Sequence, residues 1–159
     1  MAVTVDVLLA IKIRKGDTKI RIANVNSEKF PPRQIEVPQQ GGAEAIDIDA
    51  TVHEWSNYFK AGLRGASELL GKKKSSKFVS VGMDVLVDGS VPAGGGLSSS
   101  AAFVCASALA VMRANGEETV DKTELTELAI VSERAVGVNS GGFVFPPSPL
   151  SSHSNSEAN

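Results

Sequence analysis

The chain has little cysteine, little histidine and little net charge. Of its 159 residues one is cysteine and two are histidines, and the formal net charge at pH 7 is −2. A single cysteine, Cys105, excludes an intrachain disulfide and leaves no ligand set for zinc. A nearly neutral chain has no bulk field that would attract nucleic acid or an anionic membrane, so we expect neither as a partner.

Long apolar runs are also missing, although apolar residues make up 42% of the sequence. No stretch is long enough to span a membrane. The apolar run at the N-terminus contains Asp6, and the first lysines follow this run. A signal peptide has its positive charges before the apolar region, so the order is wrong for one. We therefore expect a cytoplasmic protein of one domain or a large piece of one. Cys105, inside an apolar segment, is expected to be a small buried core residue.

Hydrophobic periodicity predicts both strands and helices. Residues 3–13 and 19–25 are rich in β-branched residues and predict two strands that pair through a turn at residues 15–17. The further expected elements are a short strand at 34–37, a helix at 52–70 that opens on the capping box Thr51–Glu54, a basic solvated connector at 72–77, a strand at 78–87, a buried helix at 98–114 closed by Asn115-Gly116, and a helix from Asp121 to about Val136.

The last 17 residues differ in character from the rest. They contain five serines and three prolines without an apolar period. Such a segment cannot bury enough surface to offset the entropy of ordering it. The sequence thus predicts a domain over residues 1–142 and a disordered Ser/Pro-rich tail over residues 143–159.

The most informative stretch is residues 92–102, Pro-Ala-Gly-Gly-Gly-Leu-Ser-Ser-Ser-Ala-Ala, which runs into an apolar helix. Glycines let the backbone turn tightly and approach a ligand closely. The serines stand at a helix start, where free N–H groups and the positive end of the dipole favour an anion. This pattern predicts a loop that holds the phosphates of a nucleotide. It is not a Walker loop, because no Gly-Lys-Ser/Thr follows.

Three segments together resemble the GHMP kinases, and among them the fungal galactokinases. They are residues 92–103, the stretch Glu-Trp-Ser-Asn-Tyr-Phe-Lys at 54–60, and Val-Gly-Val-Asn-Ser-Gly-Gly at 136–142. The resemblance covers roughly residues 1–142. It implies an α+β fold, an incomplete GHMP kinase N-terminal domain of the ribosomal protein S5 domain 2-like type. It also implies a parent reaction in which ATP, with Mg²⁺, phosphorylates galactose at its anomeric hydroxyl to give galactose 1-phosphate.

The resemblance assigns roles to individual residues. Ser100 and Glu133 match the family's Mg²⁺ ligands, and Trp55 and Tyr58 match residues that flank adenine. The residues implied to wrap the ATP phosphates are Gly94, Gly95, Gly96, Leu97, Ser98, Ser99 and Ser100. Without the resemblance, plainer interpretations stay open: a glycine-rich turn before a buried helix, a solvated carboxylate beside Arg134, and aromatic core packing.

Two departures from the family's pattern bear on activity. The family's sugar-binding segment, which ends in a Gly-Glu-His-x-Asp-Tyr-like motif, lies upstream of residue 1, and Val144 stands where the family has its proposed catalytic aspartate. We therefore expect a truncated chain that keeps the ATP-binding part, has no catalytic base and is inactive alone.

Two alternatives to an inactive kinase fragment remain. One is a non-catalytic galactose sensor that regulates transcription through a repressor partner. The other is a non-functional truncated product. The complete Ser-Ser-Ser-Ala-Ala run at 98–102 favours the kinase lineage, because some of these sensors lack a Ser-Ala pair there.

Overall fold

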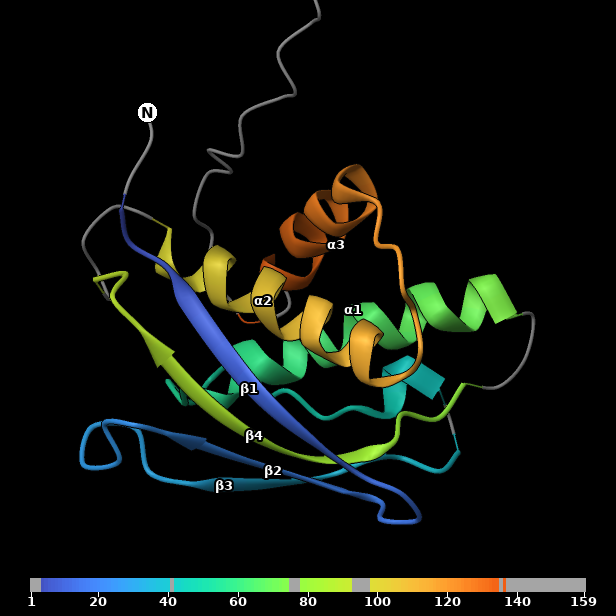
Figure 1. Ribbon diagram of the computed structural model, residues 1–159, viewed down its shortest axis with the longest axis horizontal. Coiled ribbons are helices and arrows are strands. Elements are labelled where there is room, and N and C mark those ends of the chain that lie inside the picture. Colours follow the sequence, from blue (N-terminus) through green and yellow to red (C-terminus); the bar gives the residue numbers. More distant parts are fainter. Residues whose placement is uncertain (1–3, 41, 75–77, 93–97, 135, 137–159) are drawn as a thin grey trace, which may run out of the picture.

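The structure, a computed structural model, describes residues 4–40, 42–74, 78–92, 98–134 and 136. In this part of the chain a four-stranded sheet carries the helices on one face (Figure 1). The element order is β1 (Val7–Arg14), β2 (Lys19–Asn24), β3 (Arg33–Glu36), the 3-10 helix η1 (Gly42–Ala45), α1 (Ser56–Lys74), β4 (Gly82–Gly89), α2 (Ser99–Ala114) and α3 (Lys122–Arg134). The expected α+β class is confirmed. The proposed division of the chain at residue 142 lies outside the described residues and stays a prediction.

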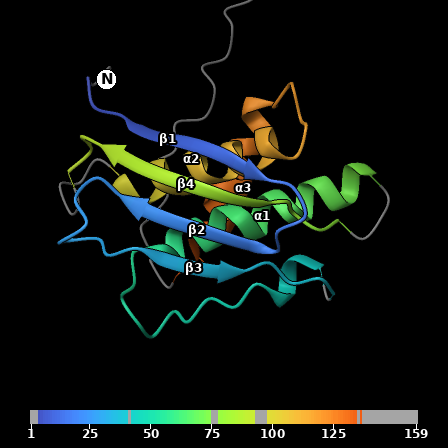
Figure 2. The same ribbon diagram turned by 60° about the horizontal axis from the view of Figure 1, so that its bottom comes forward.

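The strand order is β1-β4-β2-β3, with β4 antiparallel to β1 and parallel to β2 (Figure 2). The prediction that the first two strands pair with each other is therefore wrong. The chain does turn where expected, and Gly16 has a φ of 80° there, but β4 lies between the two strands. A turn reverses the chain without deciding which strand fills the space beside it. Here β4, whose Val85 pairs with Ile11 on one side and Ile22 on the other, takes the centre.

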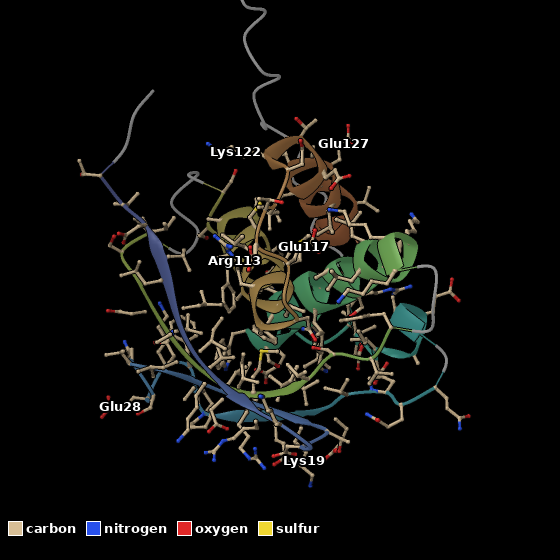
Figure 3. All side chains as sticks on the ribbon, turned by 45° about the vertical axis from the view of Figure 1, so that its right-hand side comes forward. Lys19, Glu28, Arg113, Glu117, Lys122 and Glu127 are labelled. Atoms are coloured by element: carbon tan, nitrogen blue, oxygen red, sulfur yellow. The ribbon has the colours of Figure 1, made fainter. Side chains whose placement is uncertain are left out.

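Helix α1 begins and ends about one turn later than predicted. The capping box does not form, because the backbone N–H and the hydroxyl of Thr51 both donate to Asp49 Oδ1, at 2.9 and 2.5 Å. These bonds lower the pKa of Asp49 below its usual value. At the other end, the expected solvated connector is helical through Lys74. Its Lys73 pairs with Glu117 at 3.2 Å and with Glu124 at 3.1 Å, and lysines suit a helix C-terminus. Glu117 is labelled in Figure 3.

Strand β4 is shorter than predicted at its N-terminal end. Residues 78–81 do not join the sheet. The backbone N–H of Val81 instead donates to Asn115 Oδ1 at 3.0 Å, and Asn115 Nδ2 donates to Ser80 Oγ at 3.0 Å. The end of α2 thus competes with the sheet for this segment and satisfies its polar groups.

The predicted end of α2 and the predicted start of α3 are confirmed. Asn115 closes α2 by donating from Nδ2 to Val111 O at 2.7 Å, and Gly116 follows with a φ of 86°. Asp121 begins α3 by accepting from the N–H groups of Glu124 and Thr123, at 3.0 and 2.7 Å. Those bonds hold the pKa of Asp121 below its ordinary value.

The core lies between the sheet and helices α1 and α2. Its largest fully buried side chains are Phe59, Leu63 and Leu70 from α1, Ile20, Ile22 and Met83 from the sheet, and Val104, Val111 and Met112 from α2. Helix α2 is buried on most but not all sides, since Leu109 is 38% exposed. Cys105 is half-buried rather than buried. No helix among the described residues is long and apolar enough to cross a membrane.

Candidate functional site

The N-termini of α1 and α2 lie near the start of β1 and the end of β4 (Figure 1). Residues from these element ends line a cavity of about 520 Å³. Its lining residues are Val7, Asn24, Lys29, Phe30, Pro31, Arg33, His53, Glu54, Trp55, Tyr58, Val87, Asp88, Gly89, Val91, Ser99, Ser100 and Phe103. Trp55, Tyr58, Ser99 and Ser100, which are distant in the sequence, therefore line one cavity. The fold thus brings the residues predicted to flank adenine, Trp55 and Tyr58, close to two residues predicted to bind phosphate, Ser99 and Ser100.

Trp55 lines this cavity and contacts three residues from two other segments. Its ring lies nearly parallel to that of Phe103 of α2, with centroids 6.1 Å apart and planes at 16°. The ring of Phe30 lies 5.9 Å away at 60°. The indole Nε1–H donates to Pro31 O at 3.0 Å, so this polar edge already has a partner. Trp55 is thus both a packing residue and a cavity residue.

Ser98, directly before α2, has left-handed backbone torsions, φ 52° and ψ 48°. For a residue with a Cβ this conformation costs about 1–2 kcal/mol. Its side chain makes no capping hydrogen bond, while its carbonyl accepts from Ala102 N at 3.0 Å. A strained residue at the entry of a helix that lines a cavity is an observation that favours a functional site.

Several predicted site residues lie outside the described part of the chain. They are Gly94, Gly95, Gly96 and Leu97 of the loop, Val144 and the whole tail. Glu133 belongs to the last turn of α3, but its side chain is not among those described. The phosphate loop and the Ser100–Glu133 metal pair therefore stay predictions. Among the described residues, no group of three or more histidine, cysteine or acidic side chains forms a metal site.

Sequence reasoning missed an ion pair at the rim of the cavity. Arg33, at the start of β3, donates from Nε and Nη2 to Glu54 Oε2, at 3.2 and 3.0 Å. The two residues are separated by 21 positions, and neither periodicity nor turn chemistry connects them. The only sequence signal was that Glu54 opens a stretch that resembles the kinase family.

A second hollow, of about 720 Å³, lies across the strands on the face away from the helices. Its lining includes Lys12, Arg14, Arg21 and Asp84, and none of the predicted site residues. Asp84 pairs with both Arg14 and Arg21, and the hydrogen bonds from Arg14 hold its pKa below the usual range. The charged residues that line this hollow are four basic ones, Lys12, Arg14, Arg21 and Arg33, and one acidic one, Asp84, so positive charge is in excess there.

A sheet with helices on one face and a strained helix start beside a cavity define an α+β domain with one candidate ligand site at this end. Residues 57–148 match the model of the GHMP kinases N-terminal domain, which is more than half of the chain. The chain belongs to this family. The resemblance seen in its motifs is confirmed.

Galactokinases are among its sequence relatives. One from Candida parapsilosis is 46% identical over 143 residues, which is 90% of this chain and 27% of that protein. One from Schizosaccharomyces pombe is 40% identical over 152 residues, 90% of this chain and 28% of that protein. The chain therefore spans little more than a quarter of the length of these relatives.

Solved structures share the fold. The Lactococcus lactis galactokinase complexed with galactose matches with a TM-score of 0.65 and 24% identity, over 87% of this chain and 32% of that one. The Methanococcus jannaschii mevalonate kinase matches with a TM-score of 0.62 and 15% identity, over 83% of this chain and 38% of that one. The expected GHMP kinase domain fold is confirmed.

Proposed function

We propose that this chain is the ATP-binding part of a galactokinase, whose whole reaction transfers a phosphoryl group from ATP to galactose. The observation that carries the proposal is the cavity lined both by Trp55 and Tyr58 and by Ser99 and Ser100 of α2. Flat aromatic side chains with polar edges suit a purine. The first turn of a helix suits phosphates, because its N–H groups lack intrahelical partners and its dipole favours negative charge.

In this proposal Ser100 and Glu133 hold Mg²⁺ beside the phosphates. The donor set fits, because Mg²⁺ takes hard oxygen ligands and is commonly bound by one carboxylate together with substrate phosphates and water. Ser100 lines the cavity at the start of α2, which supports its part in the pair. The metal, when bound, neutralises phosphate charge. Charge neutralisation and positioning are the two main contributions that a protein makes to phosphoryl transfer. The reactants are ATP and galactose, and the reaction takes place in the cytoplasm.

We expect the 159-residue chain itself to show no galactokinase activity. Val144 stands at the position of the family's aspartate, and loss of a general base alone costs about 10²–10⁴ in rate. ADP release should be the same with and without galactose when measured by a coupled assay. A full-length galactokinase assayed in parallel serves as the positive control. Galactose-dependent ADP release by the purified chain would contradict this expectation.

The nucleotide site is tested by calorimetric titration of the chain with ATP, with Mg²⁺ and with EDTA. Ser100→Ala should weaken binding in Mg²⁺ by about tenfold, equivalent to about 1.4 kcal/mol, and leave binding in EDTA unchanged, because the lost hydroxyl contacts the metal. Ser99→Ala is the matched control, since the resemblance gives that side chain no metal role. If Ser100→Ala loses the same affinity in Mg²⁺ and in EDTA, the assignment of Ser100 as a metal ligand is wrong. If the wild-type chain does not bind ATP, the proposed function is refuted.

A further inference from the structure

We propose that Arg33 is a positioning residue which, acting through Glu54, holds Trp55 as the wall against which a nucleotide base packs. The inference rests on the proposed function, since it takes the cavity to be a nucleotide site. It adds a role for the first residue of β3, which no motif marks. Three contacts carry it: the first and the third join residues 31–33 to the segment that leads into α1, and the second lies within that segment.

The first contact is the ion pair itself. Both Nε and Nη2 of Arg33 reach one oxygen of Glu54, at 3.2 and 3.0 Å, while Nη1 donates to Pro32 O at 3.0 Å. The guanidinium is thereby tied to the chain just before it as well as to α1. The side chains are 39% and 25% exposed, so solvent screens the attraction and its contribution to stability is small. What the pair supplies is geometry.

The second contact passes from Glu54 into the helix. The oxygen that Arg33 leaves unused, Oε1, accepts from Ser56 N at 3.4 Å, and the backbone carbonyl of Glu54 accepts from Asn57 N at 3.0 Å. Trp55 lies between Glu54 and Ser56 in the chain. Its backbone is therefore fixed on both sides by the residue that Arg33 orients.

The third contact holds the far end of the indole. Trp55 Nε1 donates to Pro31 O at 3.0 Å, and Pro31 lies two residues before Arg33. Any shift of the β3 entry away from α1 would move this acceptor together with Arg33. The ring would then lose its hydrogen bond and its approach to Phe30, 5.9 Å away. Because Phe103 stacks on the same ring, the change would open the base end of the cavity.

The experiment compares a ligand that has a base with one that lacks it. ATP and inorganic tripolyphosphate are titrated into the full chain and into Arg33→Ala. We expect Arg33→Ala to weaken ATP by about tenfold, the equivalent of one misplaced aromatic stack, and to leave tripolyphosphate unchanged. Arg33→Lys should recover part of the loss. Arg21→Ala, an ion-paired arginine on the opposite face of the sheet, should change neither titration.

An independent readout needs no nucleotide. Trp55 is the only tryptophan of the chain, so its fluorescence reports on the proposed positioning directly. In Arg33→Ala the emission should shift to longer wavelength and acrylamide should quench it more strongly. Glu54→Gln removes the charge that Arg33 binds and keeps an oxygen for Ser56, so it should show both effects as well. It serves as the test if Arg33→Ala folds poorly.

The outcomes separate the inference from the proposed function. Equal weakening of ATP and tripolyphosphate would mean that Arg33 contacts phosphate directly, which overturns the positioning role. If the wild-type chain binds both ligands, and Arg33→Ala has the same ATP affinity and the same tryptophan emission as the wild type, the inference alone is overturned. If the wild-type chain binds neither ligand, the proposed function fails and the inference falls with it.

Discussion

Gly62→Val should destabilise the protein by about 3 kcal/mol or more, at or beyond the upper end of what overpacking a core normally costs. A Cβ at Gly62 would lie 2.6 Å from Ser107 Cβ, 2.7 Å from Val104 O and 2.8 Å from Ala108 N. Two of these three atoms belong to the backbone of α2, which cannot rotate away. Helices α1 and α2 would have to separate, and the fully buried side chains between them and the sheet would lose contacts.

The same substitution should reduce ATP binding, because these two helices carry the two sides of the cavity. Urea unfolding measures the first effect and calorimetric titration with ATP the second. Glu68→Val is the matched control: it places the same β-branched side chain on an exposed position of α1. Its cost should stay near 1 kcal/mol, from helix propensity and the lost pair with Lys72. Equal unfolding midpoints for the two variants would refute the close-packing argument.

Gly95→Val should abolish ATP binding, with a loss greater than about a hundredfold, or about 2.7 kcal/mol. Gly95 is the central glycine of the run that joins Ala93 to Leu97. The predicted phosphate contacts come from backbone N–H groups, and these require an approach that only a residue without a Cβ allows. A branched side chain would occupy the space meant for phosphate oxygens.

The measurement for this variant is titration with both ATP and tripolyphosphate, and both should fail. Ala93→Val adds the same side chain to a neighbouring position that already carries a Cβ, and it should bind normally. Circular dichroism must show that the two variants melt alike. If Gly95→Val binds ATP as the wild type does, the nucleotide sits elsewhere and the assignment of the loop is wrong.

Local signals in the sequence predicted the elements of the fold well. The 3.6-residue period of apolar residues located α1, Asn115-Gly116 marked the end of α2, and Asp121 marked the start of α3. Each of these signals acts over a few residues, through capping, turn geometry or one buried face. Where a nearby side chain competed for the same hydrogen bonds, as Asp49 did for Thr51, the predicted boundary was wrong.

Part of the candidate site was also accessible from the sequence. Glycines running into serines at a helix start indicate an anion loop from backbone chemistry alone, and the stretch around Trp55 added the base side through resemblance. That these two segments line one cavity depended on how α1 and α2 cross. Sequence spacing carries no information about that crossing, because it is set by which side chains can interdigitate.

The sequence by itself determined which segments become strands and helices, and it predicts the phosphate loop before α2. The tertiary structure alone decided that β4 lies between β1 and β2 and that Arg33 meets Glu54. The physical reason is the distance along the sequence between the residues that interact. Strand placement and long-range ion pairs depend on which arrangement buries the most apolar surface after loop closure is accounted for, and that comparison involves the whole chain at once.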